Sequence, residues 1–150
     1  MRDDAPPCVY FKGTTTFFNE DIVKRKLHAE ETKVGAWSMC ADIQYTSGEG
    51  SIHLYKDLYE AGLKIWHYSG NTDAAVPTAG TRAWMHQTGW PVVHDWEPYY
   101  IRNKQVGGYA EVRGKDANVV FATCQGVGHV VPQWKPESSY KIYEKFVTGQ

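Results

Sequence analysis

The chain has 150 residues, with 16 Lys and Arg against 17 Asp and Glu, and its formal net charge is −1. This length is sufficient for one domain with its own core, and the near-neutral charge gives no electrostatic reason to expect binding to nucleic acid or to an anionic membrane. Neither a long apolar run nor the apolar segment of a signal peptide is present, so we expect no membrane span.

The N-terminal part is predicted to hold one short helix. Residues 1–16 are expected to be irregular, because two adjacent prolines favour an extended segment. The helix should follow, with Asn19 as its N-cap, acidic residues in its first turn and the basic residues 24–26 at its end. A solvated helix end explains this basic triplet more simply than a nucleic-acid patch does, because acids directly precede it.

The middle of the chain predicts a helix followed by a strand and a loop. Residues 51–61 repeat leucine and tyrosine pairs at i, i+4, which is typical of a helix that packs on a core. Residues 64–69 are rich in β-branched and aromatic side chains and favour a strand, which Gly70 ends. Asp73 therefore lies on a loop just past a strand, where α/β enzymes commonly keep catalytic residues.

The next segment predicts a helix and further strands. Thr78 is expected to cap a helix over 79–88, and residues 89–103 are expected to run from a loop into a strand. Residues 105–112 and 119–124 are predicted to form a β-hairpin.

The C-terminal part is predicted to present one histidine and then close with a helix. A glycine-rich turn after residue 124 carries His129. Pro136 suits the first position of the closing helix, and Gly149 suits its end.

Two strands are thus each followed by a loop with one ionisable residue, first Asp73 and then His129. This order matches the acid and the histidine of an α/β-hydrolase triad, which follow the nucleophile in the chain. Each residue taken singly also has a structural explanation, since Asp caps helices and Gly-Val-Gly is a turn. The pair in this order is the stronger indication of catalysis.

Two motifs strengthen this interpretation. SGNTDAAVPTAGTR, at 69–82, closely resembles the serine carboxypeptidase signature SGDxDxxVP around the catalytic acid, which a Thr-Arg helix follows. GVGHVVPQWKP, at 126–136, resembles that family's GxGHxVPxxxP around the catalytic histidine. Shorter similarities follow the family's order at 5–8, 27–28, 37–40, 106–109 and 146–149, so the resemblance covers nearly the whole chain.

The resemblance implies a fold and roles for individual residues. The fold would be the C-terminal part of an α/β-hydrolase, with a mostly parallel central sheet, flanking helices and a hairpin at the edge. His129 would be the general base and acid, and Asp73 would orient it. Asn71 stands where the family usually has its first Asp. Val130 would line the pocket for the departing residue and favour apolar ones, because an acid at that place would suit Lys or Arg.

The nucleophile of the resembled family does not occur in this sequence. The family carries its serine in a GESYAG elbow, and no G-x-S-x-G pattern is found in residues 1–150. The resemblance therefore implies a C-terminal portion that lacks the nucleophile-bearing N-terminal portion and is inactive alone, either a light chain of a cleaved enzyme or a truncated product.

The cysteines suggest how this chain would be linked to the missing N-terminal portion. The chain has 3 cysteines, so they cannot all pair within it. In the resembled family, the cysteines matching Cys8 and Cys40 form disulfides with upstream residues, so both are expected to link to the missing portion or a heavy chain. Cys124 is expected to be a buried core thiol, although a place near the active site stays open.

The function implied by the resemblance is release of C-terminal amino acids from peptides through a Ser-Asp-His triad, with no metal or cofactor. Two alternatives stay open, namely a segment of a carboxypeptidase-like acyltransferase and a non-catalytic chain that binds a peptide or a partner. The resembled family is lysosomal, vacuolar or secreted, which agrees with disulfide-type cysteines.

Overall fold

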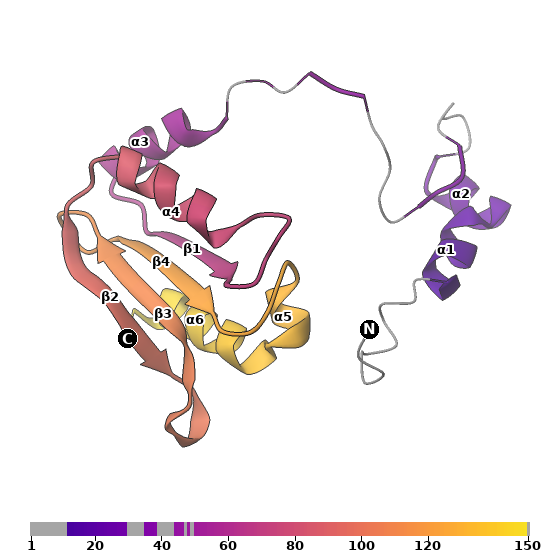
Figure 1. The fold of residues 1–150 in the computed structure, drawn as a ribbon. Helices are drawn as coiled ribbons and strands as arrows, with labels where there is room; N and C mark the ends of the chain where they lie inside the picture. The colour runs from indigo at the N-terminus through magenta and orange to yellow at the C-terminus, as the bar shows by residue number, and fades with distance from the viewer. Residues whose placement is uncertain (1–11, 30–34, 39–43, 47, 49, 150) are drawn as a thin grey trace. The chain divides into compact units, whose positions relative to one another are not determined.

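The computed structural model describes residues 12–29, 35–38, 44–46, 48 and 50–149 (Figure 1). The chain divides into two compact units, Met1–Gly48 and Glu49–Gln150. The expected disulfide cysteines Cys8 and Cys40 lie outside the described residues. Within the described residues, no helix has the length and apolarity needed to cross a lipid bilayer.

In the first unit, the described residues form two short helices, α1 (Lys12–Asn19) and α2 (Asp21–Lys26). The prediction of irregular structure is wrong for residues 12–16, and its remaining part, residues 1–11, lies outside the described residues. The prediction of Asn19 as an N-cap is also wrong, because Asn19 ends α1 and Glu20 holds the N-cap position of α2. The Asn19 amide is used elsewhere: Nδ2 donates to the Trp37 carbonyl over 2.9 Å, and Oδ1 accepts from the Trp37 amide over 2.8 Å. This distant pairing was not visible in the local pattern.

The second unit is built on a sheet of four strands in the order β1-β4-β3-β2. The strands are β1 (Ile65–Gly70), β2 (Val92–Tyr100), β3 (Val106–Arg113) and β4 (Val119–Cys124). β1 and β4 are parallel, whereas β2–β3 and β3–β4 are antiparallel. The expectation of a mostly parallel sheet is not confirmed, because short connections between consecutive strands, such as the 3₁₀ turn η2 (Arg102–Lys104), join antiparallel neighbours.

Helices cover both faces of this sheet (Figure 1). They are α3 (Ile52–Glu60), α4 (Thr78–Gln87), α5 (Val131–Trp134) and α6 (Pro136–Thr148). On one face, Val119 of β4 packs in a cluster with aromatic residues of α3 and α4. On the other face, Ala122 and Cys124 pack with Val131 of α5 and Ile142 of α6. Because alternate residues of a strand point to opposite faces, β4 is buried on both sides.

Most predicted elements of the second unit are confirmed to within about two residues, and α5 was not predicted. Thr78 is the first residue of α4 rather than its cap, since Pro77 holds the N-cap position. Its hydroxyl lies instead against the end of β1, where it donates to the Gly70 carbonyl over 3.1 Å and contacts the Ser69 hydroxyl at 3.0 Å. Thr78 therefore fastens the start of α4 to β1, and the chain between them is the loop that carries Asp73.

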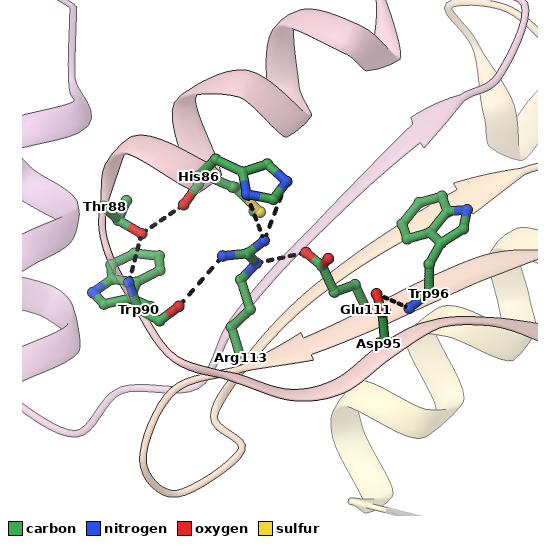
Figure 2. A network of polar contacts seen from close by, with 8 residues as sticks. His86, Thr88, Trp90, Asp95, Trp96, Glu111 and Arg113 are labelled. Atoms are coloured by element: carbon green, nitrogen blue, oxygen red, sulfur yellow. Dashed lines mark hydrogen bonds and ion pairs between the residues drawn. The ribbon is translucent and has the colours of Figure 1, made fainter.

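A buried charge pair of β3 contacts α4 (Figure 2). Arg113 and Glu111 of β3 have side chains that are 3% and 2% exposed, and Arg113 Nε lies 2.5 Å from Glu111 Oε1. The guanidinium also donates to the Trp90 carbonyl over 3.3 Å and contacts the His86 ring of α4, 3.1 Å from Nδ1. Each buried charge therefore has a partner, and Arg113 also contacts α4 through His86.

Candidate active site

The candidate site lies where β1 and β4 end. The two strands are parallel neighbours with Gly70 opposite Cys124, so their carboxyl ends meet at one edge of the sheet. Asp73 follows β1 on one loop and His129 follows β4 on the other. The pairing of these two strands therefore brings together residues that are far apart in the sequence, as the Asp-before-His order led us to expect.

The carboxylate of Asp73 and the imidazole of His129 are in contact. Nδ1 of His129 lies 3.0 Å from Oδ2 of Asp73. The other carboxylate oxygen, Oδ1, accepts hydrogen bonds from the backbone amides of Ala75 over 2.8 Å and Val76 over 3.1 Å. The Asp73 side chain is 7% exposed, whereas that of His129 is 61% exposed. The acid is thus fixed by its own loop and presents one oxygen to the histidine.

These contacts favour the ionised form of Asp73. Burial opposes ionisation, but the hydrogen bonds from the Val76 amide, the His129 ring and the Ala75 amide together hold the pKa of the carboxyl below its usual value. An ionised carboxylate can only accept, so a neutral His129 must carry its proton on Nδ1. That tautomer leaves the lone pair on Nε2, which is the arrangement a general base requires.

The two loops approach each other closely. A Cβ atom at Gly70 would overlap with the carbonyl oxygens of Val127 and Gly128, so only glycine fits at this position without a shift. The backbone amide of Thr72 donates to the Val127 carbonyl over 3.1 Å, and that of Asn71 donates to the Cys124 carbonyl over 3.0 Å. Sequence reasoning treated Gly70 simply as a strand breaker and missed that it admits the histidine loop.

The other two residues considered from the sequence, Val130 and Cys124, differ in their exposure to solvent. Val130 directly precedes α5 and is 46% exposed. Cys124 is fully buried at the end of β4, with Sγ 3.4 Å from the Tyr99 hydroxyl. Burial raises the pKa of the Cys124 thiol, against a smaller lowering by its contact with Tyr99. The expectation that Cys124 is a buried core thiol agrees with this placement.

Two potential nucleophiles at the strand ends face other partners. The Ser69 hydroxyl contacts that of Thr78, and the Cys124 thiol contacts Tyr99 on the face that α6 covers. A core thiol with a raised pKa is a poor nucleophile, because the thiolate is the reactive form. The Ser69 hydroxyl and the Cys124 thiol are therefore directed at other side chains and not at the imidazole of His129.

The family model for serine carboxypeptidases matches residues 2–149 of the chain. Serine carboxypeptidase-like 21 of Arabidopsis thaliana is 34% identical over 147 residues, which cover 96% of this chain and 29% of the relative. Serine carboxypeptidase 1 of Hordeum vulgare is 34% identical over 95% of this chain and 29% of its own length. Serine carboxypeptidase 24 of Arabidopsis thaliana is 35% identical over 89% of this chain and 29% of its own length.

The chain thus spans about three tenths of the length of the curated relatives that it matches. The match to the family model extends over nearly all of its residues and includes both loops of the site. The chain belongs to the serine carboxypeptidase family.

Proposed function

We propose that residues 1–150 are the C-terminal portion of a serine carboxypeptidase domain and supply the Asp and His of a Ser-Asp-His triad. The observation that carries this proposal is the 3.0 Å contact between His129 Nδ1 and Asp73 Oδ2, formed by two loops at the ends of adjacent parallel strands. Membership of the family supports the same assignment. The serine comes from a segment outside these residues.

Each residue has a defined task in the proposed reaction. Nε2 of His129 takes the proton of the serine hydroxyl as its oxygen attacks the carbonyl carbon of the last peptide bond. The imidazolium, stabilised by Asp73, then gives this proton to the departing amine, and the C-terminal amino acid leaves. Water repeats the sequence on the acyl-enzyme, and the serine is regenerated. Without the serine, turnover falls by about a millionfold, so the chain alone is inactive.

The partner that brings the serine fits the open side of the sheet. β1 is an edge strand, and edge strands present unpaired backbone groups that readily accept another strand. A groove of about 600 Å³ runs beside β1, lined mainly by apolar and aromatic side chains of α3, β1 and α6. The proposed partner is the N-terminal portion or heavy chain, which pairs with this edge and is linked through Cys8 and Cys40. This arrangement suits an oxidising location such as the vacuole, the lysosome or the cell exterior.

Val130 is proposed to contact the departing residue. Its valine side chain adjoins His129 in the sequence and is partly exposed, and an apolar group in this place favours apolar leaving residues. Val130→Glu in the assembled enzyme should raise the rate for a peptide ending in Arg relative to one ending in Leu. An unchanged ratio would remove Val130 from the specificity pocket.

The test uses a fluorophosphonate, which labels an activated serine. The chain is produced alone and together with the part of serine carboxypeptidase 1 of Hordeum vulgare that lies outside the matched region, and co-purification establishes that the two portions associate. We expect labelling of the assembled pair and none when His129→Gln is used. A pair that associates but takes no label in either form contradicts the triad and supports a non-catalytic binding chain.

A second assay separates hydrolysis from acyl transfer. A separate sample of the associated pair, not treated with the fluorophosphonate, is incubated with an N-blocked dipeptide, and the release of its last residue is followed by mass spectrometry. Release of the free amino acid is the expected result. Labelling without release of an amino acid would favour the acyltransferase alternative, which uses the same acid and histidine loops.

A further inference from the structure

The loop that presents His129 is held by a side chain of the neighbouring loop. Oδ1 of Asn71 accepts a hydrogen bond from the Gly126 backbone amide over 2.8 Å, and Nδ2 donates to Oε1 of Gln125 over 2.7 Å. Asn71 directly follows β1, whereas Gln125 and Gly126 directly follow β4. The side-chain amide of Asn71 therefore links the loop that carries Asp73 to the loop that carries His129, at positions that precede both residues in the sequence.

The chemistry of the partners fixes the orientation of this amide. A backbone N–H can only donate, so the group of Asn71 that faces Gly126 must be its oxygen. The NH₂ group is then left for Gln125, which must offer its carbonyl oxygen. Gly126 has a φ of +67°, a left-handed conformation in which a side chain is strained, so the amide that Asn71 receives belongs to a sharp turn.

The remaining contacts leave this loop little room to move. The Thr72 amide holds the Val127 carbonyl, and the absence of a Cβ at Gly70 lets Val127 and Gly128 lie directly against β1. The Asn71 side chain adds hydrogen bonds to the first two residues of the loop, which lie four and three positions before His129. A displacement of about 1 Å at a reacting group can lower a rate about a hundredfold.

We propose that Asn71 is a positioning residue, which acts through Gly126 and Gln125 to keep Nδ1 of His129 on Asp73 and thereby fixes the ring tautomer. The catalytic consequence rests on the proposed function, but the effect on the ring does not. An aspartate at position 71 could still accept from the Gly126 amide, and Gln125 could turn its amide to donate to it. Asn71→Asp is therefore the conservative variant, and Asn71→Ala is the disruptive one.

The ring tautomer can be measured in the 150-residue chain without any nucleophile. Histidine labelled with ¹⁵N reports by NMR which ring nitrogen carries the proton, and His129→Gln assigns the signal. In the wild-type chain at a pH where the ring is neutral, we expect the Nδ1–H form. Asn71→Ala should lose it in favour of the Nε2–H form, whereas Asn71→Asp should retain it.

Asn118→Ala is a matched control, because it removes another asparagine side chain that hydrogen-bonds to backbone next to the same sheet. Asn118 lies just before β4, at the opposite end of the strand, and donates to the Leu63 carbonyl over 3.0 Å. Asn118→Ala should leave the His129 tautomer unchanged even if it lowers the melting temperature. If Asn71→Ala fails to fold, Gln125→Ala removes one of the two bonds and should shift the tautomer partly.

The outcomes distinguish this inference from the proposed function. A folded Asn71→Ala chain with the wild-type tautomer, or an Asn71→Asp chain that loses it, overturns the role of Asn71 and leaves the triad standing. A wild-type chain without the Nδ1–H form overturns both. In the assembled enzyme, Asn71→Ala should lower kcat about 10- to 100-fold with little change in KM, and Asn71→Asp should restore most of it.

Discussion

Gly70→Ala tests whether the site depends on the close approach of its two loops. The added Cβ would overlap with the carbonyl oxygens of Val127 and Gly128 and would lie 2.9 Å from the Val127 carbonyl carbon. Ordinary contact begins at 3.4 Å, so the histidine loop must withdraw by at least half an ångström, and further at the oxygens. These atoms belong to backbone, which cannot rotate away as the end of a side chain can.

The expected effect follows from this displacement. Because about 1 Å of misplacement can lower a rate about a hundredfold, Gly70→Ala should lower kcat of the assembled enzyme by about 10- to 100-fold. Overpacking should also lower the free energy of unfolding by about 1–3 kcal/mol. The measurements are steady-state kinetics on the assembled pair, urea unfolding, and the His129 tautomer in the chain.

Gly128→Ala is the matched control, because it adds the same methyl group to the histidine loop. Its Cβ would meet the Thr72 carbonyl oxygen at 3.8 Å and the Asp73 Cα at 3.9 Å, which are ordinary contacts. It should therefore change kcat and the tautomer much less than Gly70→Ala does. Equal activity and stability of the two variants would refute the view that the approach at Gly70 sets the geometry of the site.

Three further predictions concern charge and burial. The pKa of Asp73 is lower in the folded chain than its usual value of 3.8, so the stability that the ionised carboxyl contributes is present above that pH and is lost as pH falls through the folded pKa. The melting temperature of Asp73→Asn should therefore fall less than that of the wild-type chain over this acid range. An identical fall in both chains would contradict the lowered pKa. Arg113→Met leaves the Glu111 carboxylate buried and unpaired, so unfolding in urea should show a loss of about 3–5 kcal/mol, most of which the double variant with Glu111→Leu recovers. In a chain without the other two cysteines, Cys124 should react with a thiol reagent only after unfolding, because the thiol is fully buried and its pKa is raised. Rapid labelling of the folded chain would contradict this prediction.

The local sequence pattern was sufficient to predict most helices and strands of the second unit. The helix expected over 51–61 is found at Ile52–Glu60, and the strand expected over 119–124 is found at Val119–Cys124. Periodicity and composition act over a few residues, which is the range over which these elements are determined. The approach of Asp73 to His129 was predicted from motif order and family resemblance, because nothing in the local sequence states that β1 and β4 are neighbours.

The failures share a physical cause, which is contact between distant residues. Lys12–Asn19 forms a helix where irregular chain was expected, and Asn19 is bonded to the backbone of Trp37 rather than to a helix start. The mostly parallel sheet is not confirmed, since β2–β3 and β3–β4 are antiparallel and strand direction depends on connections and pairing rather than on composition. Asn71 was noted simply as a departure from the family's motif, and its two bonds to the histidine loop became visible with the fold.

The arrangement of these contacts indicates which part of the site is built in advance. The carboxylate of Asp73 is held by two amides of its own loop, and the loop of His129 is held by Asn71, by Thr72 and by the space at Gly70. All of these constraints lie within the second unit, and none of them involves the nucleophile. The orientation of the imidazole is therefore expected to precede the arrival of the serine, so that the partner segment has a single hydroxyl to place. Preorganisation of this kind is most effective when the supporting contacts are rigid backbone and short side chains, which describes the contacts found here.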